Sequence, residues 1–346
     1  MTKMLSEILE TPSVLSRIEE LNAPLLEAFA KEFQRRKITH ITFAARGTSD
    51  NASIYGQYLY TVVGGAICSL ALCSAHTLYN ASCDYSNDLV IGVSQSGSAE
   101  DVSSVIDAAR ASGAMTLAIT NRRNSRLSNA AEFSLFCEAG EELSVAATKT
   151  FSSQLYLMLL SCAYAYGVNS LAEKARALPL EVSSAIEKIC TDIKEIAARF
   201  KDKKSGFVLA RGLAYPLALE TALKLQETSY MQMKGFATSD FWHGPLAQIE
   251  PECPVILYAL KGKCLDSARE LASKLVSIGA ELLVVTDDES TAKEYASSYL
   301  IKSTDSEFTS PFLIAIFAQL LAEALSSLKG ISPDEPRNLR KVTVTV

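Results

Sequence analysis

The sequence lacks the motifs that mark most nucleotide-, metal- and redox-dependent enzymes. It has no G-x-x-x-x-G-K-[ST] phosphate loop, no G-x-G-x-x-G opening a helix after a strand, and no H-E-x-x-H. Its three histidines and eight cysteines form no cluster with metal-ligand spacing, so we expect no metal site and no cofactor. These absences disfavour a nucleotide-dependent kinase, a dinucleotide oxidoreductase and a zinc hydrolase.

Signals for disulfides, export and membrane insertion are also missing. No two cysteines form a C-x-x-C pair, and their scattered apolar surroundings are typical of free thiols in a reducing compartment. The N-terminus, MTKMLSEILETPSVL, lacks the apolar core of a signal peptide. The most apolar stretch, 311–328, contains Gln319 and Glu323 and has no basic flanks, so we expect a buried helix there. The sequence therefore predicts a cytoplasmic protein with no membrane partner.

Positive charge is scarce as well. The net charge is −6 and there is no Lys/Arg-rich run, so we expect no nucleic-acid partner. Hydrophobic residues make up 48% of the chain and charged residues 21%, which favours a compact globular enzyme over a disordered chain. An anionic ligand would have to be held by local loops, because the negative net charge of the protein does not attract anions.

Short aliphatic runs alternate with helical patterns along the chain. Such alternation predicts an α/β fold in which a parallel sheet is covered by helices on both faces. The region 149–200 is helical throughout, and the strand pattern then restarts. The predicted strands are 38–46, 66–72, 88–94, 114–120 and 132–138 before that region, and 207–211, 254–260, 281–287 and 297–303 after it.

The restart predicts an internal repeat. ITFAARGTSDNASIYGQYL at 41–59 parallels GFVLARGLAYPLALETALKL at 206–225, since each is a strand, an Arg-Gly turn and a helix. Ligands of such halves bind at the carboxyl ends of the strands. The halves are not equivalent, because the serine-rich turn 94–98 has its counterpart near 258–264, where no serine remains.

The turn SQSGS at 94–98 ends an apolar strand and precedes a helical stretch with acidic residues at its start. In one interpretation a serine caps the helix N-terminus, which is common. In the other, hydroxyls and backbone N–H groups form a cradle for a phosphate. The turn alone does not decide between them.

Two further patterns could carry acid–base chemistry. Glu220, Lys224 and Glu227 lie at i, i+4 and i+7, on one face of a predicted helix, where the spacing alone favours a solvated ion pair. His243 lies in the turn-like segment DFWHGPL, and an imidazole there can move a proton near neutral pH. We expect structural roles for His40 and His76.

Several segments that follow one another along the chain together carry a family resemblance. They are RGTSD (46–50), SQSG (94–97), ELSVAATKTF (142–151), YPLALETALKLQETSY (215–230), FWHGPLA (241–247) and PRNLRKVTV (336–344). The sequence resembles the double sugar-isomerase (SIS) domain family, including the isomerase part of glucosamine-6-phosphate synthase and stand-alone deaminase and phosphosugar isomerase relatives. The resemblance covers nearly the whole chain.

The resemblance implies two flavodoxin-like SIS domains and a C-terminal tail that lies over the active site. We expect an N-terminal helical segment (1–30), SIS domain 1 with the phosphate site (31–190), SIS domain 2 with the catalytic Glu and His (191–330), and the tail (331–346). It also implies that the serine turn binds the 6-phosphate of a hexose. The positions carried over are Ser49, Ser94, Gln95, Ser96 and Ser98. Ser98 and Ala99 depart from the family pattern, in which an acidic residue and a phosphate-binding threonine are common.

The same resemblance implies the catalytic residues. Glu227 would be the base that carries a proton between carbons 1 and 2 of the open-chain sugar, and Lys224 would stabilise the developing oxyanion. His243 would open the sugar ring from the neighbouring subunit, which implies a homodimer with shared active sites. Lys341 would contact carbon 1 or form a Schiff base. Trp242 replaces a lysine of the synthase in this loop.

The reaction expected from these residues is conversion of glucosamine 6-phosphate to fructose 6-phosphate and ammonia. The first predicted strand begins at residue 38, so we expect no glutaminase domain. The substrate would be a hexose 6-phosphate or an amino-hexose 6-phosphate. A fructosamine-6-phosphate deglycase and a non-catalytic sugar-phosphate sensor remain as alternatives.

Overall fold

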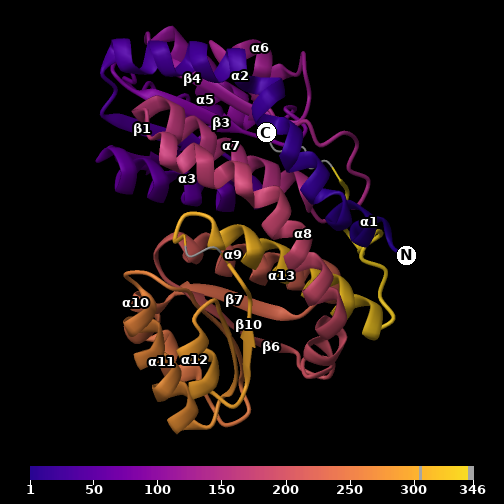
Figure 1. Cartoon of the computed structure of the whole chain (residues 1–346). Coiled ribbons are helices and arrows are strands. Elements are labelled where there is room, and N and C mark those ends of the chain that lie inside the picture. Colours follow the sequence, from indigo (N-terminus) through magenta and orange to yellow (C-terminus); the bar gives the residue numbers. More distant parts are fainter. Residues whose placement is uncertain (304–305, 342–346) are drawn as a thin grey trace. The chain divides into compact units, whose positions relative to one another are not determined.

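The chain forms two compact units, each built from separate stretches of sequence (Figure 1). The computed structural model describes residues 1–303 and 306–341, so positions 342–346 of the predicted tail lie outside the described residues. The first unit comprises Glu10–Glu142, Ala147–Pro179 and the stretch from Arg340, and the second comprises Met1–Leu9, Leu143–Ala146 and Leu180–Leu339. The predicted domain boundaries at 30, 190 and 330 stay predictions.

The first unit contains a five-stranded parallel sheet with the order β2-β1-β3-β4-β5. Each strand was predicted from its aliphatic run, and β3 and β4 are buried along their whole length. The strands are β1 (His40–Ala44), β2 (Ile67–Leu70), β3 (Leu89–Val93), β4 (Met115–Thr120) and β5 (Phe133–Phe136). This is the flavodoxin-like strand order.

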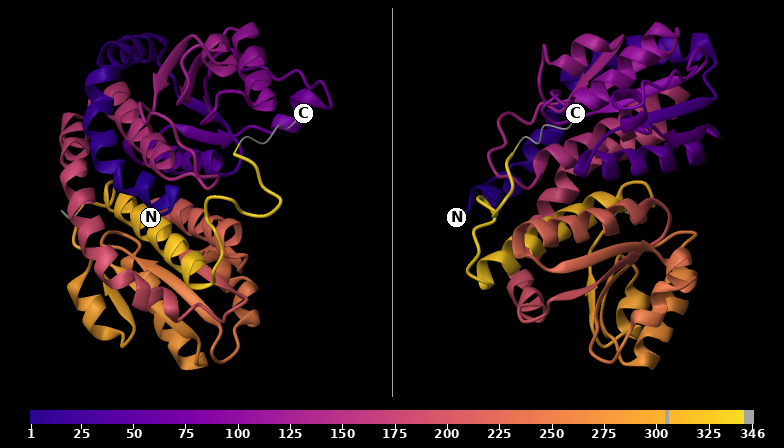
Figure 2. Two further views of the ribbon diagram at one scale, coloured as in Figure 1. Left: turned by 90° about the vertical axis from the view of Figure 1, so that its right-hand side faces the viewer. Right: turned by 180° about the vertical axis from the view of Figure 1, so that it is seen from behind.

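Helices cover both faces of this sheet, as Figure 2 shows. Helices α2, α3 and α7 pack together, and α5 packs with α4 and α6. Their bounds are α2 (Thr11–Arg36), α3 (Thr48–Gly64), α4 (Cys73–Thr77), α5 (Glu100–Ala111), α6 (Arg126–Ala130), α7 (Lys149–Tyr166) and α8 (Asn169–Ala198). The division between the units falls inside α8 at Pro179, whose ring removes one backbone donor from the helix.

The second unit repeats this topology, which confirms the predicted internal repeat. Its parallel sheet has the order β10-β9-β8-β6-β7, and the equivalent strands of the two sheets occupy equivalent places. The strands are β6 (Ser205–Ala210), β7 (Gln232–Ala237), β8 (Pro254–Ala259), β9 (Glu281–Thr286) and β10 (Ser298–Leu300). Even the Arg-Gly turns correspond, since Gly47 and Gly212 have positive φ values of 55° and 62°.

Strand β7 was not predicted. Its sequence QMKGFA mixes polar residues with a glycine, because β7 lies at the sheet edge and is only partly buried. Gly235 lets helix α9 pack directly on this strand: a Cβ there would lie 2.8 Å from the Leu219 Cα. The strand needs a glycine here because the helix backbone comes so close. This glycine interrupts the apolar sequence, so a search for aliphatic runs does not find β7.

The helices of the second unit also lie on both faces of its sheet (Figure 1), with α9 and α13 on one face and α11 and α12 on the other. They are α1 (Lys3–Leu9), α9 (Tyr215–Ser229), α10 (Thr238–Trp242), α11 (Leu265–Ile278), α12 (Glu289–Glu294) and α13 (Ser310–Leu328), with short 3-10 turns η1 (Gly212–Ala214) and η2 (Pro245–Gln248). Among the described residues, α13 alone is long and apolar enough to cross a membrane, but 89% of its apolar window is buried inside the protein. The expectation of a buried core helix is confirmed.

Candidate active site

The serine turn forms a tight loop between β3 and α5. Ser94 is buried and its Oγ accepts a hydrogen bond from the Gly97 N–H at 3.2 Å. The Ser96 hydroxyl accepts from the Ser98 N–H at 3.3 Å and lies 2.7 Å from the Ser98 Oγ. Gly97 has a φ of 63°, and a Cβ at this position would lie 2.2 Å from the Ser125 Oγ. Glycine is therefore required for this turn, which gathers three hydroxyls.

No serine side chain caps the helix that follows. Helix α5 begins at Glu100, and the N-cap position is occupied by Ala99, which has no side-chain acceptor. Helix α3 likewise begins after Gly47 with no side-chain cap. The N-cap interpretation of the serine turn is therefore wrong. The first N–H groups of a helix have no intrahelical partner, so the start of α5 can donate to an anion. At the start of α3, the Ser49 and Asp50 N–H groups already donate to the Arg46 and Gly47 carbonyls.

The two helix starts lie at the switch point of the sheet. Strands β1 and β3 are hydrogen-bonded neighbours, with Ala44 opposite Gly92, and the chain continues from them to opposite sides of the sheet. Ligands of open α/β sheets bind at this point, beyond the carboxyl ends of the strands. Ser49, in the first turn of α3, is buried, and its Oγ accepts from the Gln154 Nε2 at 3.0 Å.

Side chains hold the remaining parts of this edge in place. The Arg46 Nε donates to the buried Asp101 carboxylate at 2.7 Å, which ties the turn after β1 to the start of α5. This hydrogen bond raises the pKa of the Arg46 guanidinium. Gln95 is half-buried, and its backbone oxygen accepts from the Asn121 N–H at 3.0 Å. The loops that carry the predicted phosphate-binding residues are therefore held by the Arg46–Asp101 ion pair and by the Asn121–Gln95 hydrogen bond.

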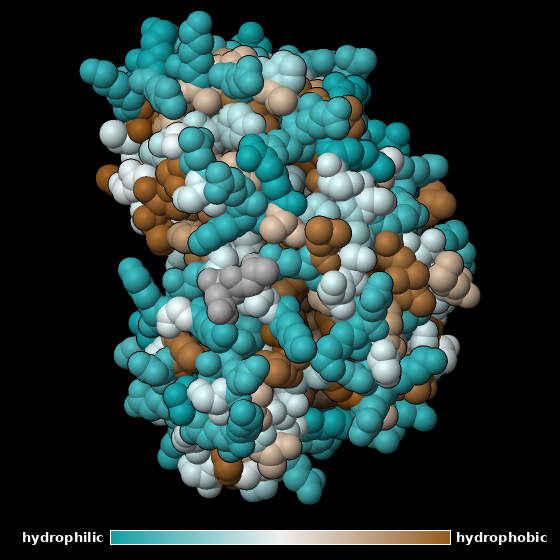
Figure 3. All heavy atoms as spheres, in the orientation of Figure 1, coloured by the Kyte–Doolittle hydropathy of each residue, from teal (hydrophilic) through white to brown (hydrophobic). Residues whose placement is uncertain are grey.

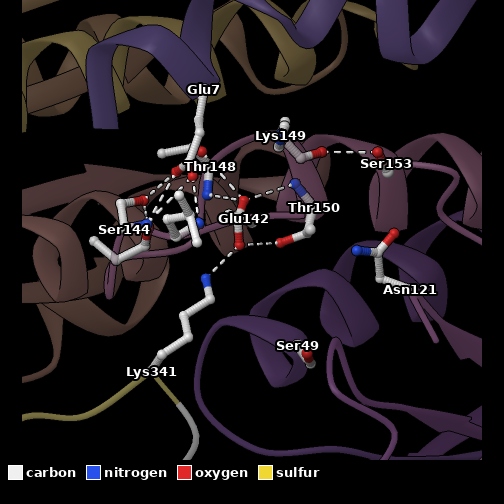
Figure 4. A network of polar contacts seen from close by, with 12 residues as sticks. Glu7, Ser49, Asn121, Glu142, Ser144, Thr148, Lys149, Thr150, Ser153 and Lys341 are labelled. Atoms are coloured by element: carbon white, nitrogen blue, oxygen red, sulfur yellow. Dashed lines mark hydrogen bonds and ion pairs between the residues drawn. The ribbon is translucent and has the colours of Figure 1, made fainter. Parts of the chain in front are cut away.

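The predicted Lys341 is joined to a buried carboxylate that the sequence analysis did not assign (Figure 4). The Lys341 Nζ lies 2.5 Å from the Glu142 Oε2. Glu142 also accepts from the N–H groups of Thr148 and Thr150, at 3.0 and 3.1 Å, and from the Thr150 hydroxyl at 2.7 Å. Burial raises the pKa of Glu142, but Lys341 and these hydrogen bonds outweigh it, so the pKa is lowered. The motif ELSVAATKTF begins at this residue and was the available signal.

A second buried carboxylate holds the next part of the same loop. Glu7 of α1 accepts from the backbone N–H groups of Leu143 and Ser144 and from the Ser144 hydroxyl at 2.5 Å (Figure 4). Asp334 accepts from the Lys3 and Met4 N–H groups, both at 2.8 Å, and so caps α1. Sequence reasoning missed Glu7, because an acid in a short N-terminal helix gives no local signal.

In the second unit, Glu220, Lys224 and Glu227 form one cluster on α9. The Lys224 Nζ lies 2.5 Å from the Glu227 Oε2 and 3.4 Å from the Glu220 Oε1. The side chains of Glu220 and Lys224 are 1% and 0% exposed, whereas that of Glu227 is 21% exposed. A solvated ion pair is therefore excluded. Burial lowers the pKa of Lys224, but the two carboxylates outweigh it, so the pKa is raised and the ammonium stays charged.

His243 lies apart from that cluster within the second unit. It is exposed and directly follows α10, just beyond the carboxyl end of β7. Glu227 is in the last turn of α9, which leads into the opposite end of β7. A six-residue strand spans about 20 Å, so Glu227 and His243 of one chain lie near opposite ends of β7.

The other two histidines make local contacts. The His40 Nδ1 lies 3.0 Å from the Asp88 carboxylate, and the His76 Nε2 lies 3.0 Å from the Tyr85 hydroxyl. Within residues 1–303 and 306–341, no three His, Cys, Asp or Glu side chains are arranged to hold a metal ion.

Comparison with known proteins accounts for this geometry. The SIS domain model matches residues 35–163 and 199–326, one match in each half of the internal repeat. The chain belongs to the SIS domain family. The two matches contain β1 to β5 and β6 to β10, so each SIS domain supplies one of the two sheets.

Curated relatives of this SIS protein include glutamine–fructose-6-phosphate aminotransferases (isomerizing). The enzyme from Gloeobacter violaceus is 34% identical over 99% of this chain, and that from Methanothermobacter thermautotrophicus is 35% identical over 99%. The chain spans 58% and 57% of the length of these two relatives.

Solved structures show the same two-domain fold. A candidate phosphosugar isomerase from Silicibacter pomeroyi has a TM-score of 0.88 and 26% identity, with 96% of this chain and 100% of that chain covered. The C-terminal domain of glucosamine-fructose-6-phosphate aminotransferase from Francisella tularensis has a TM-score of 0.87 and 25% identity, covering 97% and 98%. A glucosamine-6-phosphate deaminase from Thermotoga maritima has a TM-score of 0.79 and 22% identity, covering 99% and 100%, a likeness of fold alone.

Proposed function

We propose that this SIS protein is a phosphosugar isomerase and deaminase that converts glucosamine 6-phosphate to fructose 6-phosphate and ammonia. The observation that carries the proposal is the Glu227–Lys224–Glu220 cluster, in which a buried cation holds a partly exposed carboxylate at 2.5 Å. Such a carboxylate is held in one orientation, as a general base must be. The proposal is also supported by the names of a relative and of a similar structure, which refer to fructose 6-phosphate and to a phosphosugar.

The serine turn supports a phosphorylated substrate. Ser94, Ser96, Ser98 and Ser49 supply hydroxyls at the switch point of the first sheet, where two helices begin without side-chain caps. The hydroxyls and the N–H groups at the start of α5 would donate to the 6-phosphate, together with Gln95. Ser98, which pairs with Ser96 at 2.7 Å, would take the place of the threonine lost at Ala99.

Glu227 would take a proton from one of carbons 1 and 2 and return it to the other. A single base suffices because both carbons of a cis-enediol or enolamine face the same side. Lys224 is fully buried, so it would act on the oxyanion through its charge and would also hold the Glu227 carboxylate in place. This arrangement favours a role for Lys224 in positioning over direct contact with the sugar.

His243 would open the pyranose ring of the amino sugar by moving one proton. Because Glu227 and His243 of one chain lie near opposite ends of β7, the histidine that serves a given Glu227 would come from a second subunit. The separation therefore favours a homodimer with shared active sites.

Lys341 would lie near carbon 1, with Glu142 holding its ammonium. The Lys341 Nζ lies 2.5 Å from the Glu142 carboxylate, and this contact favours an electrostatic role over attack on the sugar. Once the ketimine has formed at carbon 2, attack by water would release ammonia and fructose 6-phosphate. The reaction needs no cofactor.

The test is a coupled assay of the purified protein with glucosamine 6-phosphate, in which ammonia and fructose 6-phosphate are measured together. We expect equal amounts of both products. Glu227→Gln should abolish turnover and leave binding of the phosphosugar nearly unchanged, because the carboxylate acts on the transition state. Calorimetry measures the binding.

The matched control is Ser94→Ala with Ser96→Ala, which should instead lose binding. Each hydroxyl contact with a charged group contributes on the order of 1.5–3 kcal/mol, so the dissociation constant should rise more than about tenfold. Binding without ammonia release would reassign the protein to a fructosamine-6-phosphate deglycase or a sensor. Equal affinity for glucosamine and its 6-phosphate would contradict the phosphate site.

A further inference from the structure

The turn after β8 is the counterpart, in the second unit, of the serine turn after β3. The two strands occupy equivalent places in their sheets, and each leads through a turn into a helix, α11 or α5. Each turn contains a glycine with positive φ, 125° at Gly262 and 63° at Gly97. The β8 turn (residues 260–264) reads LKGKC and contains no serine. The second unit therefore keeps a glycine turn at this place without the hydroxyls of the first.

A carboxylate lies against the β8 turn. The Glu307 Oε1 accepts a hydrogen bond from the Lys263 N–H at 2.8 Å. Gly262 leaves the space for this side chain, because a Cβ at that position would lie 2.2 Å from the Glu307 Cδ. A phosphate oxygen accepts from the same kind of backbone N–H group near the start of a helix. Glu307 therefore occupies the position that a bound anion would take at this turn.

Glu307 also leaves little free space beside the turn. The cavity that remains there has a volume of about 20 Å³, roughly enough for one water molecule. Its lining includes Arg211, Tyr258, Lys261, Cys264 and Glu307. A phosphate is larger than a water molecule, so it does not fit while the Glu307 side chain is in place.

Basic residues surround this position. Arg211 lines the cavity and follows β6, as Arg46 follows β1 in the first unit. Lys261 also lines the cavity, and Lys263 supplies the N–H group that Glu307 accepts. Figure 3 shows hydrophilic and intermediate side chains over most of the part of the second unit that Figure 1 labels α11 and α12. These surroundings suit an anion.

Of the two carboxylates at the turn, Glu307 is the one that a ligand could replace. Asp287 accepts from the Lys261 N–H at 2.6 Å, but it also accepts from the hydroxyls of Ser303 and Ser310, at 3.0 and 2.7 Å. Asp287 is therefore part of the framework. Within residues 1–303 and 306–341, the Lys263 N–H is the only hydrogen-bond donor to the Glu307 side chain.

We propose that the Glu307 carboxylate blocks the second SIS domain to phosphate and so confines the phosphate group of the substrate to the serine turn of the first. Glu307 lies between β10 and α13, and the equivalent segment of the first unit, between β5 and α7, contains Glu142. Without the Glu307 side chain, the Lys263 N–H, Arg211 and Lys261 would hold a free phosphate. The inference rests on the proposed function in one respect, since it takes the serine turn as the phosphate site.

A purely structural role for Glu307 makes a different prediction. An acidic side chain near the N-terminus of α11 stabilises that helix through the helix dipole. In that case, removal of the carboxylate lowers the stability of the fold and creates no phosphate site. The number of phosphates bound per chain therefore separates the two roles.

Equilibrium dialysis of the full chain against labelled inorganic phosphate counts the sites. We expect one phosphate per chain in the wild type and two in Glu307→Ala. Glu307→Gln is the matched control: it removes the same charge, but its amide oxygen still accepts from the Lys263 N–H, so it should bind one. Adding Arg211→Ala to Glu307→Ala should weaken the second site at least about tenfold, because the phosphate loses a charged partner.

Hydrogen exchange locates the second phosphate. The Lys263 amide should be protected in the wild type with or without phosphate, since Glu307 accepts from it. In Glu307→Ala it should exchange rapidly without phosphate and slowly with phosphate. The β8 amides, which lie in the middle of the sheet, should stay protected throughout and so show that the variant is folded. If Glu307→Ala does not fold, Glu307→Ser takes its place.

A Glu307→Ala chain that binds no additional phosphate would overturn the inference. An equal gain in Glu307→Gln would overturn it as well, because the cause would then be the lost charge alone. Repeating the count with Ser94→Ala and Ser96→Ala keeps the two proposals apart. If these serine substitutions leave the wild-type count unchanged while Glu307→Ala still adds one phosphate, the proposed phosphate site fails and this inference stands.

Discussion

The Lys224 ammonium lies between two carboxylates in the core of the second unit, with no exposed surface of its own. A buried cation is stable only while its counter-charges remain in place, because desolvation costs each ion several kcal/mol. The ion pair with Glu227 therefore stabilises the fold by keeping Lys224 charged, and it also orients the carboxylate that we propose as the general base.

Replacing Lys224 with Met should leave Glu220 as a buried carboxylate without its cation. We expect the free energy of unfolding to fall by about 3–5 kcal/mol, measured in urea. Lys188→Met provides the control, since Lys188 is exposed and pairs with Asp192 at 3.2 Å on α8; its loss should cost less than about 1 kcal/mol. Equal effects of the two substitutions would contradict a charged, buried Lys224.

Glu142 provides a prediction for pH dependence. Its pKa is lowered below the usual 4.5, so its ionised form adds stability above pH 4.5, and that contribution is lost as the pH falls through the lowered pKa. The difference in unfolding free energy between the wild type and Glu142→Gln should therefore be constant above pH 4.5 and shrink below it. Urea titrations between pH 7 and pH 3 measure the difference. A difference that grew toward low pH would mean that the Glu142 pKa is raised.

Among the single elements, the proposed phosphate site depends on one turn. The chain leaves β3, turns at Gly97 with a φ of 63° and enters α5 within a few residues. The hydroxyls of Ser94 and Ser96 both accept hydrogen bonds from backbone N–H groups inside this turn. The hydroxyl positions therefore follow from the backbone conformation.

Gly97→Ala should disturb these hydroxyls, because its Cβ would lie 2.2 Å from the Ser125 Oγ and 2.8 Å from the Thr120 Oγ1. We expect the KM for the phosphosugar to rise at least about tenfold, with a smaller change in kcat. Gly113→Ala is the control: Gly113 follows α5, has a φ of 87° and has no atom within 4 Å of an added Cβ. It should lose stability through its backbone alone, with an unchanged KM. A KM that rose equally in both variants would argue against the turn as the binding element.

In the whole molecule, the proposal of a site shared between two copies depends on the separation of Glu227 from His243 within one chain. They lie near opposite ends of strand β7. A site that uses both residues would then take Glu227 from one subunit and His243 from the other.

Mixing inactive Glu227→Gln and inactive His243→Ala subunits should restore part of the activity, because a heterodimer then contains one site with both wild-type residues. Random pairing makes half of the dimers heterodimers, so the mixture should reach about a quarter of wild-type activity per site. Exchange of labelled subunits is measured in the same mixture. If subunits exchange and no activity returns, each site is built within a single chain.

Most strands and the internal repeat were predictable because they depend on local sequence patterns. Aliphatic runs place nine of the ten strands, since a parallel strand buried on both faces needs a continuous apolar sequence. The Arg-Gly turns at Gly47 and Gly212 indicate the repeat, because a positive φ favours glycine wherever the turn recurs. Strand β7 escaped because its burial depends on α9 lying against Gly235, a contact between elements.

The candidate site divides in the same way. The proposed site residues in the SQSGS turn, the Glu220–Lys224–Glu227 helix, His243 and Lys341 could be named from the sequence because their segments resemble the SIS family. Tertiary structure alone decided that Lys224 is a buried ion with two partners, that Glu142 holds Lys341, and that Glu7 holds the adjoining loop. Burial and pairing between distant residues depend on which elements pack together in the folded chain, and the local periodicity of the sequence does not contain this information.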